Sequence, residues 1–274
     1  MTSLAVAVAF AVFIWWFSTG LVLLLNRLSR TGVRASQTLS SLLLLGALYG
    51  LNHTAGQTDL ASAYCAFTCA LLAWGWNELS FLTGWITGPR KSAIAPELNG
   101  WPRFVESVRA ILWHEIGIIA VGALIIGLTW ERPNQIGTGT FLVLWLLRTS
   151  AKLNLFWGVR NLSEQFLPAH LSYLESFFRR RAMNAFWPVS VLAACAALAW
   201  LVAQALDPAA APAQAVGLTL VSTLLTMAIV EHLMLVLPLD TTALWRWALR
   251  NDKRTGHRHE KHTPLTNTAL RPGP

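Results

Sequence analysis

Charged residues are scarce in this 274-residue sequence. Asp, Glu, Lys and Arg together make up 12% of the chain, whereas a soluble domain carries about 25%. Hydrophobic residues make up 54% and occur in long runs separated by short polar stretches. The shortage of charge excludes an ordinary soluble domain, and the long apolar runs predict an all-α, polytopic helical membrane protein.

Cysteines and metal-binding motifs are also scarce. The three cysteines are too few for a disulfide framework. Cys65 and Cys69 lie on one face of a predicted helix, and we interpret them as small packing residues rather than as a metal or redox pair. The histidine pair of a zinc protease and the repeated Glu-x-x-His of a di-iron bundle are absent from the sequence. We therefore expect no metal site.

The net charge of +8 raises the question of a nucleic-acid partner. No basic stripe falls on a soluble module, so we expect no nucleic acid. We interpret the excess of positive charge instead as loops that face the anionic lipids of a bilayer.

Seven apolar segments each approach the length of about 20 residues that a helix needs to cross a bilayer. They are Leu4–Leu25, Gln37–Gly56, Leu60–Ile86, Val108–Trp130, Gly139–Arg160, Asn184–Leu206 and Ala215–Leu237. Lys and Arg gather after the first, third and fifth segments and in the tail, whereas the opposite side holds only Arg132. This asymmetry predicts seven transmembrane helices with a periplasmic N-terminus and a cytoplasmic C-terminus. We expect a membrane domain over residues 1–237 and a polar, mostly disordered cytoplasmic tail over residues 238–274.

The connection between the fifth and sixth segments contains "SEQFLPAHLSYLESFFRRR". Leu167, Leu171, Leu174 and Phe178 recur there at helical spacing, which predicts a cytoplasmic interfacial helix. The helix either lies on the lipid surface or packs on the inner ends of the transmembrane helices. The candidate residues for contact with a partner or with the membrane surface are Asn161, Glu164, His170, Arg179, Arg180 and Arg181.

A small set of ionisable residues falls inside the apolar segments. The set is Glu78, His114, Glu115, Arg148, Lys152, Glu231 and His232. Counted from the inner ends of their segments, Glu78, His114, Lys152 and Glu231 lie at a similar depth of about 9–12 Å, and Arg148 lies one turn deeper. An unpaired charge in hydrocarbon costs several kcal/mol. We therefore expect Arg148 and Lys152 to face the carboxylates in one buried polar cluster, which either fixes helix packing, binds a ligand or takes part in proton transfer or catalysis.

Tryptophan is abundant, with 14 residues. On the third segment, Trp74, Phe81 and Trp85 share a helix face with Glu78. A tetrapyrrole needs a neutral imidazole as ligand and flat aromatic walls. The candidate pigment-binding residues are therefore Trp74, Phe81, Trp85, His114 and His232. The alternative is that the histidines are hydrogen-bonded packing residues and that many tryptophans form interfacial belts.

Four stretches resemble a known family. They are "WGWNELSFLTGWITGPRK", "WHE" at residues 113–115, "LRTSAKLNLFWGVRNLSEQFLPAHLSYLESFFRRRAMNAFWPVS" and "EHLMLVLPLDTTALWRWAL". These stretches resemble the PuhE family of photosynthetic-complex assembly proteins from purple phototrophic bacteria. The resemblance covers the third to seventh segments, whereas the first two segments and the tail are generic.

The resemblance implies a protein of the bacterial inner membrane or the intracytoplasmic photosynthetic membrane. Its implied role is to assist assembly of the reaction centre and core light-harvesting complex. Its implied partners are subunits of these complexes or other assembly factors. The implied ligand is bacteriochlorophyll or a precursor, handled transiently, and no catalytic residue is implied.

We therefore expect a non-enzymatic assembly factor. The alternative from another class is a membrane enzyme that acts on a pigment or isoprenoid intermediate, with Glu115, Lys152 and Glu231 as acid–base groups. A proton-coupled transporter is a further alternative. The outer halves of the segments hold few polar groups beyond His53 and Asp59, which argues against a water path across the membrane.

Overall fold

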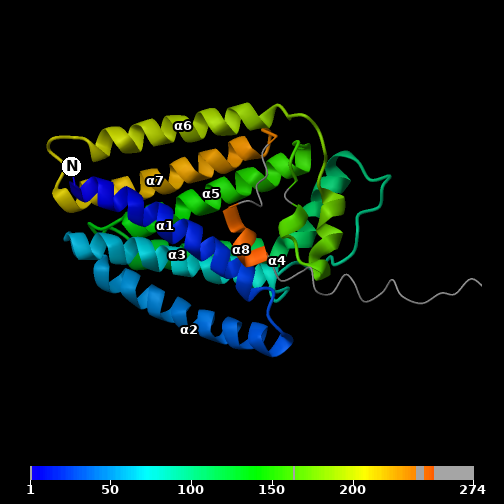
Figure 1. Ribbon diagram of the computed structural model, residues 1–274, viewed down its shortest axis with the longest axis horizontal. Coiled ribbons are helices and arrows are strands. Elements are labelled where there is room, and N and C mark those ends of the chain that lie inside the picture. The colour runs from blue at the N-terminus through cyan, green and yellow to red at the C-terminus, as the bar shows by residue number, and fades with distance from the viewer. Residues whose placement is uncertain (1, 163, 239–243, 250–274) are drawn as a thin grey trace, which may run out of the picture.

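The computed structural model describes residues 2–162, 164–238 and 244–249. Within these residues, seven long α-helices lie lengthwise in one bundle (Figure 1). They are α1 (Thr2–Leu25), α2 (Arg30–Thr54), α3 (Leu60–Leu82), α4 (Gly100–Thr129), α5 (Ile136–Trp157), α6 (Phe186–Ala205) and α7 (Pro212–Met234). Each helix overlaps one of the seven apolar segments. The described residues form no β-strand, only a single bridge between Val159 and Arg180, so the all-α prediction is confirmed.

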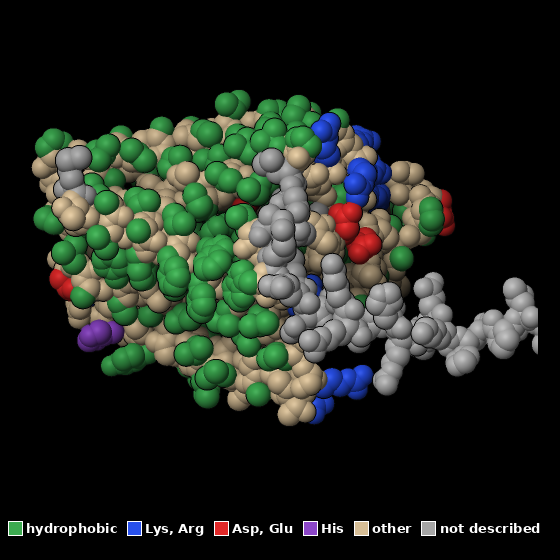
Figure 2. Space-filling view, viewed as in Figure 1, with side chains coloured by type: hydrophobic (Ala, Val, Ile, Leu, Met, Phe, Trp, Pro, Cys, Tyr) green, Lys and Arg blue, Asp and Glu red, His purple; other side chains and the backbone are tan. Residues whose placement is uncertain are grey.

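Four of the helices, α1, α4, α6 and α7, are long and apolar enough to cross a membrane. The other three helices contain polar side chains within their apolar runs, such as Gln37 in α2, Asn77 in α3 and Lys152 in α5. Figure 2 shows hydrophobic side chains over most of one face of the molecule, with Lys and Arg toward the end at right. These features fit a membrane protein.

The central helix is α3, which contacts α1, α2, α4, α5 and α7. Its buried Ala66, Ala70 and Ala73 are small, which lets neighbouring backbones approach closely. Gly137 of α5 is a second point of close approach, because a Cβ atom there would lie 2.2 Å from a methyl carbon of Leu51. The position of α3 explains why polar residues on it can reach several other helices.

The connection between α5 and α6 differs from the α-helix that the sequence predicts. It contains two 3₁₀ helices, η1 (Glu164–Phe166) and η2 (Ala169–Phe177). Leu171, Leu174 and Phe177 are buried, and their spacing of three residues is that of a 3₁₀ helix. The prediction was wrong in placing Phe178 on the apolar face, because the tighter helix turns Phe177 inward instead. The buried face of η2 packs against Phe81, Ile94 and Ala110, over the ends of α3 and α4 (right in Figure 1).

One further prediction needs correction. The helix face predicted to include Trp85 stops short, because α3 ends at Leu82 and Gly84 has a φ of 79°. Trp85 therefore lies beyond the helix and is 57% exposed.

Part of the predicted tail is ordered. A short helix, α8 (Arg246–Leu249), lies against α1. The indole of Trp245 is buried, and the indole N–H of Trp16 donates to the Leu244 carbonyl at 3.0 Å. The predicted disorder of the remaining tail concerns residues that lie outside the described ones.

Candidate functional site

Two ion pairs join α5 to its neighbours. Arg148 Nη2 lies 3.1 Å from Glu78 Oε2 of α3, and Lys152 Nζ lies 2.5 Å from Glu115 Oε1 of α4. Lys152 also interacts electrostatically with Arg148 and Glu78. The structure thus joins four residues of the predicted polar cluster in two ion pairs. Because the two cations lie one turn apart on α5, the pairs hold three helices in register.

His114 of α4 is a packing residue. It is 1% exposed, and its ring centroid lies 4.4 Å from that of Phe81. Its Nε2 atom is buried without a hydrogen-bond partner in the described part of the chain. Any ligand would have to displace Phe81 or the surrounding helices to reach this ring.

In contrast to His114, His232 of α7 has a partner at both ring nitrogens. Its Nδ1 lies 2.9 Å from the Ala228 carbonyl oxygen, which can only accept, so the ring proton is on Nδ1. Its Nε2 lies 3.0 Å from the Ser150 hydroxyl oxygen and accepts from that group. The Trp187 indole N–H donates to the backbone carbonyl of His232 at 2.8 Å. His232 therefore links α5, α6 and α7, and neither ring nitrogen is open to a metal.

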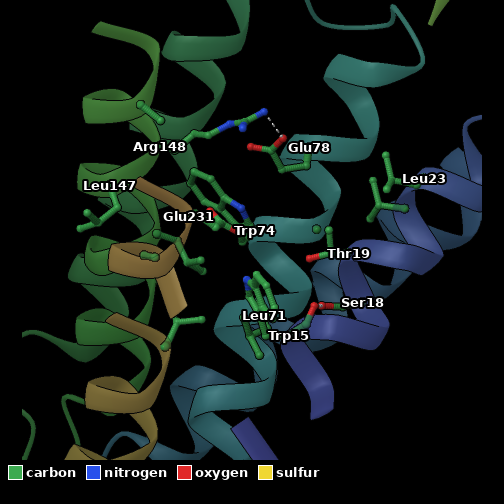
Figure 3. A pocket seen from close by; sticks show the side chains of 16 residues that line it. Trp15, Ser18, Thr19, Leu23, Leu71, Trp74, Glu78, Leu147, Arg148 and Glu231 are labelled. Atoms are coloured by element: carbon green, nitrogen blue, oxygen red, sulfur yellow. Dashed lines mark hydrogen bonds and ion pairs between the residues drawn. The ribbon is translucent and has the colours of Figure 1, made fainter. Parts of the chain in front are cut away.

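A pocket of about 180 Å³ lies among α1, α3, α5 and α7 (Figure 3). Its charged side chains are Glu78, Arg148 and Glu231. In Figure 3 the Glu78–Arg148 pair lies at one end, and Glu231 lies beside Trp74. The remaining wall is mostly apolar, with two hydroxyl groups from α1; it includes Trp15, Ser18, Thr19, Leu71, Leu144, Leu147 and Leu224.

Glu231 differs from the other carboxylates of the set. Its side chain is exposed, and it makes no hydrogen bond or ion pair with any residue that the structure describes. It interacts electrostatically with Arg148 and Glu78. Glu115 and Lys152 do not line this pocket. The predicted set therefore separates into a pocket group, a neighbouring ion pair and two packing histidines.

The aromatic residues predicted to form one wall are also separated. Trp74 lines the pocket and packs edge-on against Phe141, with ring centroids 5.6 Å apart. Phe81 covers His114, and Trp85 lies beyond the helix. Trp15 of α1, which the sequence does not single out, provides the second indole of the pocket.

The candidate surface residues occupy the end of the molecule formed by η1, η2 and the start of α6. Glu164 and Arg180 form an exposed ion pair at 2.6 Å, and Arg179 donates to the Asn99 side chain at 3.2 Å. Asn161 is structural, because its side chain donates to the Met234 and Leu237 carbonyls at the end of α7. The side chains left exposed are those of His170, Arg180 and Arg181.

Comparison with known proteins assigns the chain to a family. The family described as "Protein of unknown function (DUF3623)" matches residues 1–256. The chain belongs to this family. It is 38% identical over 242 residues to a Rhodobacter capsulatus protein described as "Uncharacterized 30.4 kDa protein in puhA 5'region", which covers 87% of this chain and 88% of that protein. No solved structure matches the chain.

Arg103 of α4 is a structural residue that sequence reasoning counted only as a positive charge on the inner side. It is 5% exposed, and its guanidinium donates to the carbonyls of Phe177 at 2.6 Å and Phe156 at 3.3 Å. The guanidinium also lies over the Phe156 ring, 4.6 Å from the centroid. A periodicity argument cannot find this contact, because the acceptors are backbone groups far away in the sequence.

Asn154 and Asn184 form a second buried polar link. The Asn184 side chain donates to the Asn154 side-chain oxygen at 3.1 Å and to the Gly158 carbonyl at 3.0 Å. Its side-chain oxygen accepts from the backbone N–H groups of Phe186 and Trp187, which begin α6. An asparagine next to the apolar run of the sixth segment is the only sequence signal for this link.

Proposed function

We propose that the protein is a non-enzymatic assembly factor for the photosynthetic reaction centre and its core light-harvesting complex. The observation that carries the proposal is the similar Rhodobacter capsulatus protein, whose description places it in the 5′ region of puhA. The resemblance to the PuhE family, which shares the puh designation, supports the same role. The expected partners are reaction-centre or core-antenna subunits or other assembly factors.

A deletion strain tests this role. Under phototrophic conditions we expect reduced amounts of assembled reaction centre and core antenna, measured by near-infrared absorbance of isolated membranes. Expression of the full chain from a plasmid should restore the amounts. Normal levels of both complexes in the deletion strain would rule out the proposal.

We further propose seven membrane-spanning helices in the inner or intracytoplasmic photosynthetic membrane, with a periplasmic N-terminus and a cytoplasmic C-terminus. The support is the overlap of each apolar segment with a long helix and the asymmetry of Lys and Arg. Exposed Ala209, between α6 and α7, should then face the periplasm, and exposed Ser92 the cytoplasm.

Cysteine labelling tests the orientation. In a background without the native cysteines, Ala209→Cys should react with an impermeant maleimide in intact spheroplasts, whereas Ser92→Cys should react only after permeabilisation. The reverse pattern would refute the orientation. Labelling of both in intact cells would refute the span count.

A docking role for the surface of η1 and η2 follows from the assembly proposal. The exposed Arg180 and Arg181 lie on this surface, whereas Arg132 lies exposed between α4 and α5. Replacing Arg180 and Arg181 together with Ala should lower the amount of assembled complexes, and Arg132→Ala is the matched control. Equal levels in the two variants, at equal protein abundance, would argue against docking at this surface.

Transient handling of bacteriochlorophyll or a precursor is an extension of the proposed role. His114 is buried against Phe81, and both ring nitrogens of His232 are hydrogen-bonded. Neither arrangement favours histidine ligation, so we place any pigment contact at the pocket beside Trp74. Protein gently extracted from pigment-replete cells should carry pigment absorbance. Colourless preparations would contradict the extension. A drop in pigment absorbance confined to the His114→Ala or His232→Ala protein would support histidine ligation instead of contact at the pocket.

The enzyme alternative requires Glu115, Lys152 and Glu231 to act on one substrate. Glu231 lines the pocket, whereas the other two are paired with each other outside its lining. This separation favours the non-enzymatic proposal. A Glu231→Gln strain that accumulates a pigment or isoprenoid intermediate, with the protein at its normal level, would contradict it.

A further inference from the structure

The pocket among α1, α3, α5 and α7 has an apolar part and a charged end. Its volume of about 180 Å³ exceeds that of an engineered apolar cavity of about 150 Å³ that binds benzene. Leucines from α3, α5 and α7 line the apolar part, and Glu78, Arg148 and Glu231 form the charged end. A space of this size and polarity suits the head group and first carbons of an amphiphile.

The charged end lacks one positive charge. Glu78 and Glu231 are formally negative, and Arg148 is the only cationic side chain that the described residues contribute to the lining. Arg148 donates to Oε2 of Glu78, whereas Oε1 of the same carboxylate is buried without a hydrogen-bond partner in the described part of the chain. Glu231 likewise makes no hydrogen bond or ion pair with the described residues. Two carboxylates therefore present oxygen atoms that lack a donor, in surroundings where an uncompensated charge is costly.

The chemistry that completes this end is a cation with several N–H donors. A primary ammonium group supplies one positive charge and three donors. The indoles of Trp15 and Trp74 line the same pocket and attract a cation to their ring faces. An anionic head group would meet two carboxylates, and the guanidinium of Arg148 is already paired.

We propose that this pocket binds an amphiphile with a primary ammonium head group, which contacts Glu231 and Glu78 while its chain lies along the leucines. The inference goes beyond the assembly role and does not depend on it. The amine belongs either to a lipid head group such as phosphatidylethanolamine or to a free alkylamine. The two sources share the chemistry that the pocket recognises.

Binding to the purified full-length protein in maltoside micelles tests the proposal. The probes are dodecylamine, dodecanol and dodecanoate, which share one chain length, and the signal is the tryptophan fluorescence of the protein. Dodecylamine should bind at least about tenfold more tightly than the other two, as expected for one added charge-assisted hydrogen bond. Equal or tighter binding of dodecanol or dodecanoate would overturn the proposal.

Two variants locate the site. Glu231→Gln keeps the shape of an exposed side chain that has no described partner, and it should weaken dodecylamine binding about tenfold. Gly75 lines the pocket, and a Cβ atom there would meet no atom within 4 Å. Gly75→Leu should therefore fill the pocket without loss of folding and abolish binding. Gly127→Leu of α4, which also has open space, is the matched control. Unchanged dodecylamine affinity in either pocket variant would refute the site.

Mass analysis of retained lipid separates the two sources. Phosphatidylethanolamine that stays with the wild type and the Gly127→Leu protein but is lost from Gly75→Leu identifies a lipid head group. Dodecylamine binding without retained lipid identifies a free amine. An anionic lipid lost specifically from Gly75→Leu would contradict the ammonium assignment.

Discussion

Replacing Glu115 with glutamine removes the only ion-pair partner that Lys152 has among the described residues. The side chains are 19% (Lys152) and 22% (Glu115) exposed, so the lysine keeps little access to water. Removing one partner of a buried pair costs about 3–5 kcal/mol, and a lysine at the centre of a membrane helix costs about 3 kcal/mol on insertion scales. Because about a fifth of each side chain remains exposed, we expect Glu115→Gln to lower the free energy of unfolding by about 2–3 kcal/mol.

The exposed Glu164–Arg180 pair provides a control. Its side chains are 37% (Glu164) and 64% (Arg180) exposed, so Glu164→Gln should cost less than about 1 kcal/mol. Replacing Lys152 with methionine in the Glu115→Gln protein removes the unpaired cation. Most of the lost stability should then return, since a neutral pair of similar volume avoids the desolvation of a charge.

The assay is equilibrium unfolding of the purified protein in mixed micelles, followed by tryptophan fluorescence. A double-mutant cycle from the wild type, Glu115→Gln, Lys152→Met and the double variant gives the interaction free energy between the two side chains. A loss in Glu115→Gln no larger than in Glu164→Gln, or a double variant no more stable than Glu115→Gln, would refute the buried ion pair.

Three further predictions concern local contacts. A Cβ atom at Gly20 would lie 2.1 Å from the Trp247 ring, so Gly20→Leu should detach α8 from α1. Limited proteolysis should then cleave the C-terminal segment faster than in the wild type. An unchanged cleavage rate would contradict this contact. Asn184→Ala removes the acceptor of the first two backbone N–H groups of α6 and the hydrogen bonds to Asn154 and Gly158, and should lower the free energy of unfolding by about 2–3 kcal/mol. A loss below that of Glu164→Gln would show that the link is unimportant. Asp59 caps the start of α3, and hydrogen bonds from the Ser62 hydroxyl and backbone N–H lower the pKa of its carboxyl group. The cap therefore stabilises the fold above the ordinary carboxyl pKa. This stabilisation is lost as the pH falls through the lowered pKa. The thermal stability of Asp59→Asn should therefore approach that of the wild type as pH falls, and a constant difference across pH 3 to 7 would disagree.

Hydrophobic runs were sufficient to predict the helices, because each long apolar run must become a helix to satisfy its backbone. Depth counting together with charge balance was sufficient to suggest which helices carry the partners of Arg148 and Lys152. It could not assign the pairs, since Glu78, Glu115 and Glu231 all lie at a similar depth. The rotation of each helix about its axis decides the pairing, and that rotation depends on packing of the whole bundle.

The pocket was less accessible to sequence reasoning. Trp15 and the hydroxyl groups of α1 carry no charge, so a search limited to ionisable residues passes over them. His232 reads as a ligand candidate in sequence because its acceptor, the Ala228 carbonyl, and its donor, Ser150, become visible only in three dimensions. The sequence prediction placed Phe178 inward because it lies four residues after Leu174, a spacing that is typical of one face of an α-helix. In the 3₁₀ helix η2 the repeat is three residues, so Phe177 is buried instead.

Arg103 joins parts of the chain that are synthesised at different times. Its acceptors, the carbonyls of Phe156 and Phe177, follow it by 53 and 74 residues. Translation therefore completes the start of α4 well before either acceptor has left the ribosome. The guanidinium therefore cannot make either hydrogen bond until α5 and then η2 have been synthesised. A nascent chain arrested before residue 177 lacks the shorter of these two hydrogen bonds.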